Sequence, residues 1–400
     1  MAQLEAEIRH AFERRLASMP ARPDLRARIS DAVGQQSSRT QIWRVAAASA
    51  ALLLVGAVAL FALLARHIPP APIIGPTPTP SVASPTATAT ATVSSVPRPG
   101  VPGTPGPRLG ASMAWDKKDG YLVMFGGARY GASGNVPYND TWVWAGDTWR
   151  QLKPPTSPPG RTFPAMAFDE RSQRLLAFGG GAANSDPFRN DTWAWDGTTW
   201  TELHPTTTPP ACGEARMVYD PELPGIVLVF QPCAGDAAYA TTWTWTGTNW
   251  LQLKPTTNVT RRGEFGLVHF TNLGDVLVGG EFGPPPDGNR DDVWTFKGGT
   301  WTQLRQATRP VAGPCVIAFD ADSGVVVLLP LGIQQTWTWD GANWTLQKPA
   351  HSPPILAFPA IGYDPASGQV VLFGGKTDSL RGSPVLDQTW IWNGNDWQKR

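Results

Sequence analysis

The alternation of apolar and polar residues divides the chain into a helical beginning, one long apolar run and a large region of short strands. Apolar residues recur every three or four positions over residues 3–19, which predicts an amphipathic helix. Residues 45–65 contain no charged side chain. Beyond residue 108, apolar and polar residues alternate in short runs that Gly, Pro, Asn and Asp separate. Such runs predict many short β-strands.

The apolar run at 45–65 predicts a transmembrane helix, because a helix of this length crosses the hydrocarbon core of a bilayer. A cleaved signal peptide would have a shorter apolar core closer to the N-terminus, and a buried globular helix is a further alternative. Several arginines lie shortly before the run, whereas only Arg66 lies as close behind it. Because basic flanking residues stay in the cytoplasm, we expect a single-pass protein of the cell membrane with its C-terminal bulk outside the cytoplasm.

Residues 1–44 form the predicted cytoplasmic helical region. Pro20 and Pro23 end the first helix, and a second short helix is expected after them. One interpretation is a juxtamembrane helix that lies on the inner leaflet or pairs with itself. The alternative is a docking site for a cytoplasmic regulator such as a sigma factor, which would make the protein a transmembrane sensor. The Cys and His ligands of zinc-type anti-sigma domains are absent from this region.

Residues 66–107 are rich in Pro and Thr and predict a disordered, extended stalk. Proline removes backbone donors and fixes φ, so such a segment adopts an extended conformation rather than packing into a core. The stalk would hold the following domain away from the membrane. Its Thr and Ser residues also suit O-glycosylation, which composition alone leaves open.

Tryptophan is unusually frequent, with 19 residues in the chain, and most of these residues belong to a repeat of roughly 50 residues. Each copy has two aromatic residues separated by one position and a third Trp five positions later. A Gly precedes that third Trp by three positions. The six copies begin at Trp142, Trp193, Trp243, Trp294, Trp337 and Trp390.

Each copy contains four strand-like segments, a to d, joined by turn signals. In the second copy, the sequence around Asp196 and Gly197 predicts the hairpin between strands c and d. An Asp followed by a Gly closes most of the a–b turns. Four antiparallel strands per copy predict a β-propeller blade, and six copies predict a six-bladed, all-β propeller over residues 108–400.

The copies resemble kelch repeats, in which a Gly-Gly pair ends strand b and Asn-Asp-x-Trp opens strand c. The pair Gly126-Gly127 precedes Asn139-Asp140-Thr141-Trp142, and the second copy repeats this arrangement. The sixth copy keeps Gly374-Gly375, the fourth keeps part of the pattern, and the third and fifth copies lack the Gly pair. The resemblance implies a propeller of the galactose-oxidase and kelch type.

The tryptophans are expected to pack between blades, where large flat indoles fill the space between sheets that splay apart. A sugar-stacking platform made of these rings is the alternative, but it would require them to face solvent. All six copies carry strands a to d in order, and the chain ends within the last strand d. We therefore expect the ring to close mainly by blade packing, unless residues near 101–108 add a strand.

Ligand binding is expected at one end of the propeller. The b–c loops and d–a links emerge together there, and they are longer and more varied than the turns at the other end. The short loop of the fifth copy would leave a notch in this face. A solvated loop residue is the alternative interpretation for each candidate. The candidate binding residues are Arg108, Tyr130, Tyr138, Arg161, Phe188, Arg189, Tyr239, Arg262, Phe282, Arg290 and Arg381.

Three cysteines permit one geometric argument. Cys212 precedes strand a of the third copy, and Cys233 follows its strand b. Antiparallel pairing brings these two ends together, so a disulfide between them is possible outside the cytoplasm, with free thiols as the alternative. Cys315 begins strand a of the fifth copy and is expected to be a buried thiol.

No catalytic or metal-binding motif is recognised, so we expect no cofactor and a protein that binds without turnover. Acidic residues outnumber basic ones in the propeller region, which argues against nucleic acid as a partner. The predicted function is that of a membrane-anchored extracytoplasmic module with a protein or carbohydrate ligand at the loop end. A polysaccharide-active propeller enzyme and a transmembrane sensor are the alternatives.

Overall fold

The computed structural model describes residues 100–131, 134–181, 188–211, 213–231, 238–281, 288–377 and 383–400. The predicted cytoplasmic region, the span at 45–65 and most of the stalk lie outside these residues. Within them, no helix is long and apolar enough to cross a membrane.

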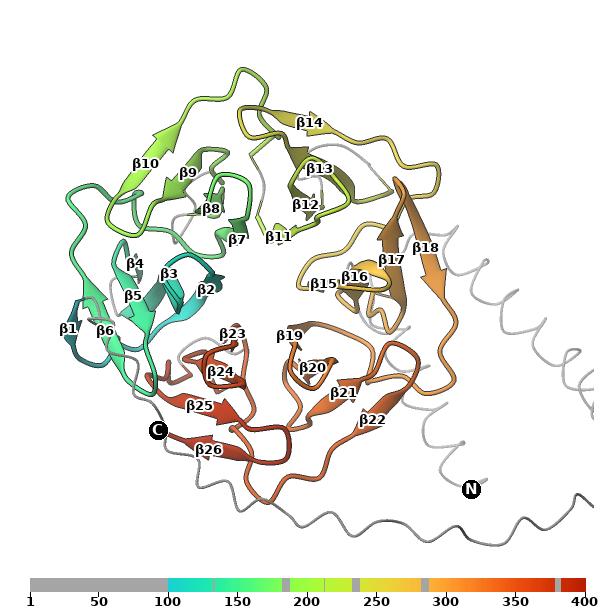
Figure 1. Cartoon of the computed structure of the whole chain (residues 1–400). Helices are drawn as coiled ribbons and strands as arrows, with labels where there is room; N and C mark the ends of the chain where they lie inside the picture. Colours follow the sequence, from blue (N-terminus) through green and yellow to red (C-terminus); the bar gives the residue numbers. More distant parts are fainter. Residues whose placement is uncertain are drawn as a thin grey trace, which may run out of the picture. The chain divides into compact units, whose positions relative to one another are not determined.

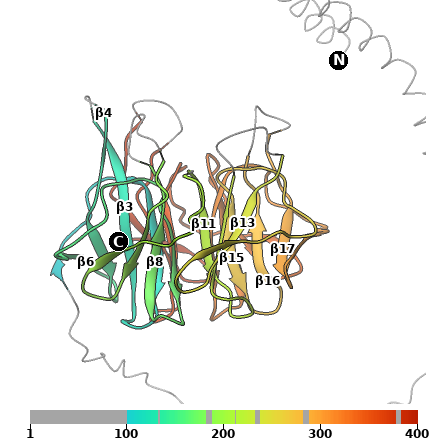
Figure 2. The ribbon, with the colours of Figure 1, turned by 90° about the horizontal axis from the view of Figure 1, so that it is seen from above.

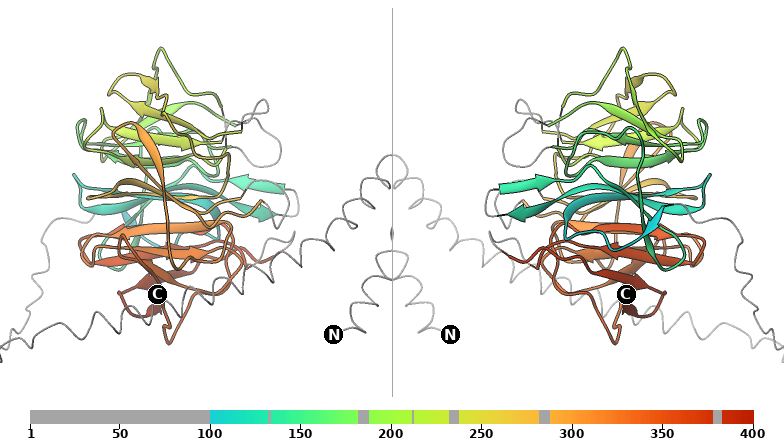
Figure 3. Two further views of the ribbon diagram at one scale, coloured as in Figure 1. Left: turned by 90° about the vertical axis from the view of Figure 1, so that its right-hand side faces the viewer. Right: turned by 90° about the vertical axis from the view of Figure 1, so that its left-hand side faces the viewer.

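Six antiparallel sheets stand around a central axis and form a six-bladed β-propeller (Figure 1). Each sheet contains four strands that follow one another in the chain, as the repeat predicted, and strand a lies nearest the axis. Figure 3 shows the same sheets from the side. Blade 1 comprises β2 (Leu109–Asp116), β3 (Tyr121–Gly131), β5 (Thr141–Trp144) and β6 (Trp149–Leu152). Blade 2 comprises β7 (Ala165–Asp169), β8 (Arg174–Phe178), β9 (Thr192–Trp195) and β10 (Trp200–Leu203). Blade 3 comprises β11 (Arg216–Tyr219), β12 (Ile226–Phe230), β13 (Thr241–Trp245) and β14 (Trp250–Gln252).

The second half of the ring repeats this arrangement, with four strands in each sheet of the described residues. Blade 4 comprises β15 (Gly266–Phe270), β16 (Gly274–Val278), β17 (Val293–Lys297) and β18 (Thr300–Leu304). Blade 5 comprises β19 (Cys315–Asp320), β20 (Val325–Pro330), β21 (Trp337–Trp339) and β22 (Trp344–Leu346). Blade 6 comprises β23 (Ala360–Asp364), β24 (Gln369–Phe373), β25 (Thr389–Trp392) and β26 (Trp397–Lys399).

Blade 1 carries two additional strands. β4 (Gly134–Pro137) pairs with the end of β3 and makes a ribbon that rises above its blade (Figure 2). β1 (Val101–Pro102) pairs with the outer strand β6, and the Gly103 amide donates to the Trp149 carbonyl at 3.1 Å. Residues 100–107, which the sequence analysis assigned to the stalk, are therefore attached to the outer edge of blade 1.

The ring closes by blade packing and by backbone hydrogen bonds, because among the described residues no strand that precedes β2 enters blade 6. The Gly110 amide donates to the Phe358 carbonyl at 2.9 Å, and the Gly375 amide donates to the Arg108 carbonyl at 2.8 Å. β2 and β23 lie side by side at this junction (Figure 1). This arrangement confirms the predicted mode of closure, and β1 lengthens its own blade instead of linking two blades.

The tryptophans fill the space between adjacent blades, as predicted. Trp195 and Trp200 are each 1 % exposed and pack at a centroid distance of 5.4 Å in the cluster between blades 1 and 2. Equivalent pairs recur in the other blades, with Phe296 in place of Trp in blade 4. Burial of each ring stabilises the fold by roughly 2–3 kcal/mol. The platform interpretation is therefore excluded for these buried rings.

A chain of side-chain hydrogen bonds links the blades around the ring. In five of the six junctions, the Trp of strand d donates its indole N–H to the hydroxyl of a Thr that opens strand c of the preceding blade. The pairs are Trp149 with Thr389, Trp200 with Thr141, Trp250 with Thr192, Trp301 with Thr242, and Trp397 with Thr336, at 2.9 to 3.0 Å. In the remaining junction, between blades 4 and 5, Val293 stands where the others have Thr. The indole N–H of Trp344 accordingly has no partner among the described residues.

Candidate functional site

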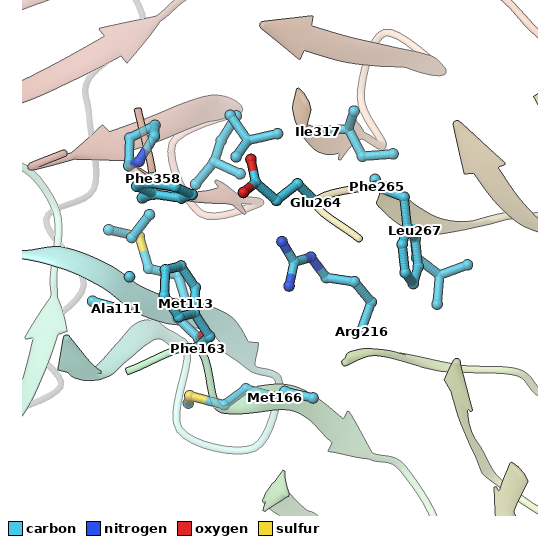
Figure 4. A pocket seen from close by; sticks show the side chains of 18 of the residues that line it. Ala111, Met113, Phe163, Met166, Arg216, Glu264, Phe265, Leu267, Ile317 and Phe358 are labelled. Atoms are coloured by element: carbon cyan, nitrogen blue, oxygen red, sulfur yellow. The ribbon is translucent and has the colours of Figure 1, made fainter. Parts of the chain in front are cut away.

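A cavity of about 140 Å³ lies on the axis, where the inner strands of all six blades begin (Figure 4). Because strand a follows the d–a link, these strand beginnings lie toward the end where the d–a links and b–c loops emerge. We call that end the loop face. It is the end at which the sequence analysis expected binding. The residues that shape the cavity wall include Gly110, Phe163, Arg216, Glu264 and Phe358.

Left-handed backbone recurs at one equivalent position just before the inner strand or at its start. Phe163 has φ 55°, Glu214 59°, Glu264 53° and Phe358 57°, and Gly110 occupies the corresponding place in blade 1. Non-glycine residues in this conformation are strained by about 1 kcal/mol each. Such strain is concentrated at functional sites in proteins, so the three strained residues that line one cavity, Phe163, Glu264 and Phe358, mark it as a candidate site.

Two of these residues give the cavity an aromatic side. The rings of Phe163 and Phe358 meet edge to face at a centroid distance of 5.3 Å and an interplanar angle of 75°. A Cβ at Gly110 would lie only 2.9 Å from the Phe163 ring. Glycine at 110 therefore permits both the positive φ and the close approach of this ring.

Arg216 and Glu264 give the opposite side of the cavity its charge. Figure 4 shows the guanidinium group and the carboxylate directed into the same space. The one hydrogen bond that the Arg216 side chain makes within the described residues is to the Ala215 carbonyl at 3.1 Å. No described carboxylate lies within 4.0 Å of its guanidinium nitrogens. Most of the donors of Arg216 are thus available to a ligand.

The surroundings of Glu264 bring its titration close to neutral pH. Burial, together with the neighbouring carboxylates of Glu214 and Glu281, raises the pKa of Glu264 to about 7 against the opposing charges of Arg216 and Lys376. Burial likewise raises the pKa of Glu214 and lowers that of Arg216. Glu264 can therefore hold or release a proton near pH 7.

Glu214 is a neighbouring carboxylate whose charge acts on both Arg216 and Glu264. A Cβ at Gly263 would lie 1.9 Å from its Oε2 atom, so only glycine leaves room for this carboxylate. The Gln231 amide donates to the same oxygen at 3.4 Å. Glu214 therefore acts on the cavity mainly through its charge.

Three of the predicted binding residues have structural partners away from the cavity. The Arg108, Arg161 and Arg262 side chains are at most 1 % exposed. Each donates two hydrogen bonds to one Asp and a third to the first carbonyl of a Gly-Gly pair. The Asp in turn accepts from the first Trp of strand c. The Asp partners are Asp140, Asp191 and Asp292, and the Trp donors are Trp142, Trp193 and Trp294.

The other described candidates are spread over the loop face. Phe188 is 45 % exposed and Tyr239 is 52 % exposed. Tyr138 is half-buried, and the centroid of its ring lies 4.2 Å from the Arg108 guanidinium carbon. Arg189 and Arg290 are also half-buried.

Several predicted residues lie outside the description. The side chain of Tyr130 is not described, and neither are Phe282 and Arg381. Cys212 and Cys233 are also outside the described residues, so their disulfide stays a prediction. Cys315 is a buried free thiol as expected, and burial raises its pKa to about 12.

Exposed apolar residues add a second feature to the loop face. The exposed large apolar residues on the loop face are Val136, Phe188, Tyr239, Val311, Ile333 and Ile355. The others in the described part of the chain are Val101, Leu251 and Leu346, which lie on outer strands. Ile333 lies in the short loop of blade 5, where the notch was expected, and Ile355 precedes Leu356, whose carbonyl accepts a hydrogen bond from the Gly332 amide of that loop.

Sequence reasoning missed Arg216, Glu264, Phe163 and Phe358. One signal was available, because Phe163 and Phe358 each precede the Asp of their a–b turn by six residues, as Glu214 does. Aligning the copies on that Asp would have placed these side chains in one ring. No group of His, Cys, Asp and Glu residues suited to a metal ion occurs among the described residues.

Comparison with known proteins supports the fold. No family model matches the chain. A solved structure titled "Structure of YjhT" is similar to it with a TM-score of 0.50 and 14% sequence identity, and the match covers 75% of this chain and 99% of that chain. At this identity the similarity concerns the fold alone, which is that of a six-bladed β-propeller.

Proposed function

We propose that the protein is a membrane-anchored, extracytoplasmic interaction module of the kelch type, and that its loop face binds a protein or glycan ligand. The apolar run at 45–65 and its basic flank support the anchor and the orientation. The three clusters of Arg, Asp, Trp and Gly-Gly support the kelch type, because each joins residues of the repeat motif in the same way.

One observation carries the binding proposal. The axial cavity and six of the exposed large apolar side chains of the described residues occur on the same face, whereas the opposite face consists of short turns. Exposed apolar groups around a concave site are a common feature of interaction surfaces. A rigid ring of blades also holds the loops in fixed positions, which lowers the entropy cost of binding.

A pair of matched double variants tests this proposal. Residues 93–400, which form a compact unit, would be screened against a glycan array and against extracellular proteins from the same source. We expect Phe188→Ala with Tyr239→Ala to weaken the binding found in the screen by at least about tenfold. The control, Leu251→Ala with Leu346→Ala, removes exposed apolar residues from the outer strands and should leave binding unchanged. Equal losses in both variants, or no loss in either, would contradict a loop-face site.

The proposed orientation has its own test. Protease added to intact cells should digest the propeller of the full-length protein and leave an epitope tag at the N-terminus protected. Protection of the propeller until the cells are lysed would reverse the orientation. The sensor hypothesis depends on residues 1–44, and deletion of this region followed by measurement of transcription would test it.

An enzyme is the second candidate function, because Glu264 titrates near pH 7 and shares its cavity with Arg216. That combination suits general acid–base catalysis on a polysaccharide. Incubation of the protein with the glycans it binds, followed by mass spectrometry, would reveal turnover. A product that disappears in Glu264→Gln, with binding retained, would favour the enzyme over the binding module.

A further inference from the structure

We infer that the axial cavity binds a single neutral, polyhydroxylated ring, such as one sugar unit, held by Arg216 and Glu264 against the rings of Phe163 and Phe358. The inference rests on the proposed function, since it assigns the chemistry of a ligand at the loop face. It goes further by naming the ligand class and the residues that select it.

Hydrogen-bonding capacity is the first argument. Arg216 directs donors into the cavity with no carboxylate partner among the described residues, and Glu264 supplies acceptors there. A hydroxyl group can accept from a guanidinium and donate to a carboxylate at the same time. Adjacent hydroxyls on one ring therefore satisfy both residues without leaving a buried polar group unpaired.

Charge is the second argument. The charged groups that act on Glu264 are Glu214, Glu281, Arg216 and Lys376. Of these, Arg216 alone lines the cavity together with Glu264, so an anionic ligand that pairs with the guanidinium would also lie against the Glu264 carboxylate, which disfavours it. A cationic ligand would approach the guanidinium of Arg216, and the resulting repulsion disfavours it as well. A neutral ligand avoids both costs.

Shape is the third argument. The cavity of about 140 Å³ is smaller than the several hundred Å³ typical of sites for drug-sized ligands. One ring fits this space, and a longer chain would extend outward over the loop face. The edge-to-face pair of Phe163 and Phe358 offers an apolar surface to the C–H groups of such a ring.

Preorganisation is the fourth argument. Phe163, Glu264 and Phe358 all have a strained, left-handed backbone, which sets the direction in which each side chain leaves the chain. Such strain persists because the surrounding blades hold it in place, so little ordering remains to occur on binding. The aromatic and polar walls are thus in position before the ligand arrives.

The test uses the full-length protein in a detergent without a sugar headgroup, because glycoside detergents would compete for the site. Isothermal titration would be carried out with neutral hexoses and N-acetylhexosamines, with a hexuronate as the anionic arm and an alkyl diamine as the cationic arm. We expect a neutral ring to bind and Arg216→Met or Glu264→Gln to weaken this binding by at least about tenfold. Glu202→Gln, an exposed carboxylate change on β10, is the matched control and should bind normally.

Both cavity variants are compared with wild type by thermal unfolding, and Glu264→Gln keeps the test valid if Arg216→Met fails to fold. Three results would overturn the inference: no neutral ring binds at concentrations that saturate a millimolar site, the hexuronate or the diamine binds more tightly, or the cavity variants bind as wild type does. Binding on the glycan array that depends on Phe188 and Tyr239 but not on Arg216 or Glu264 would leave the proposed function intact and reject the cavity as the sugar site.

Discussion

At the scale of single residues, the repeat shows which side chains depend on one another. Blades 1, 2 and 4 have both the buried Arg and its Asp, and the other three blades have neither. Their equivalent pairs are Cys212 with Thr241, Ala312 with Gln335, and Leu356 with Gln388. A buried guanidinium without its carboxylate leaves an uncompensated charge, so the two residues must change together.

Replacement of one member of an Arg–Asp pair should therefore lower the free energy of unfolding more than replacement of both members. Arg161→Leu leaves Asp191 without the cation that, against the effect of burial, holds its pKa below the ordinary value. We expect a loss of about 3 kcal/mol in the free energy of unfolding. Arg161→Leu with Asp191→Gln copies the pair of blade 6 and should recover most of that loss in chemical denaturation. A double variant as unstable as the single one would contradict this account.

The titration of Glu264 predicts how stability depends on pH. Because the folded pKa of about 7 exceeds the ordinary 4.5, the folded state keeps a proton that the unfolded chain releases in this interval. Stability contributed by this group is therefore lost as pH rises from about 4.5 to about 7. The unfolding free energy of Glu264→Gln minus that of wild type should therefore increase by on the order of 1–3 kcal/mol as the pH rises from about 4 to about 8. A difference that does not change with pH would show that Glu264 titrates normally.

At the scale of elements, the junctions between blades differ by one hydrogen bond. The Thr that opens strand c supports the next blade in five junctions, and Val293 leaves the sixth without this contact. The alternation of each strand could be predicted from the sequence, as could the burial of its tryptophans. The bonds between blades could not, because strand periodicity indicates which face a residue occupies and not which neighbour it reaches.

Two substitutions test this hydrogen bond in opposite directions, one at the junction of blades 2 and 3 and the other at the junction of blades 4 and 5. Thr192→Val removes the acceptor for Trp250 and should lower the unfolding free energy by about 1–2 kcal/mol. Val293→Thr should supply the missing acceptor to Trp344 and raise stability by about 1 kcal/mol. Thermal unfolding measures both changes. Destabilisation by Val293→Thr would show that the hydroxyl cannot reach the indole.

At the scale of the whole molecule, the number of blades could be predicted from the sequence, but the composition of the axial cavity could not. Trp spacing is a local signal that survives in all six copies. Arg216 and Glu264 belong to the neighbouring blades 3 and 4, whereas Phe358 of blade 6 reaches the same cavity because the blades form a ring. The backbone conformation of Glu264 and Phe358 was also unexpected, since Glu and Phe seldom adopt positive φ and tertiary packing overrides that preference.

Hydrogen exchange of the full-length protein, measured with and without the glycan that it binds, tests the central claim most directly. The account predicts slower exchange at the beginnings of the inner strands, around residues 110, 163, 214–216, 264–265 and 358, and in the loops beside them. The outer strands and the short turns of the opposite face should exchange at the same rate in both states. Protection confined to those outer strands or turns would contradict the claim that the loop face and its axial cavity form the binding site.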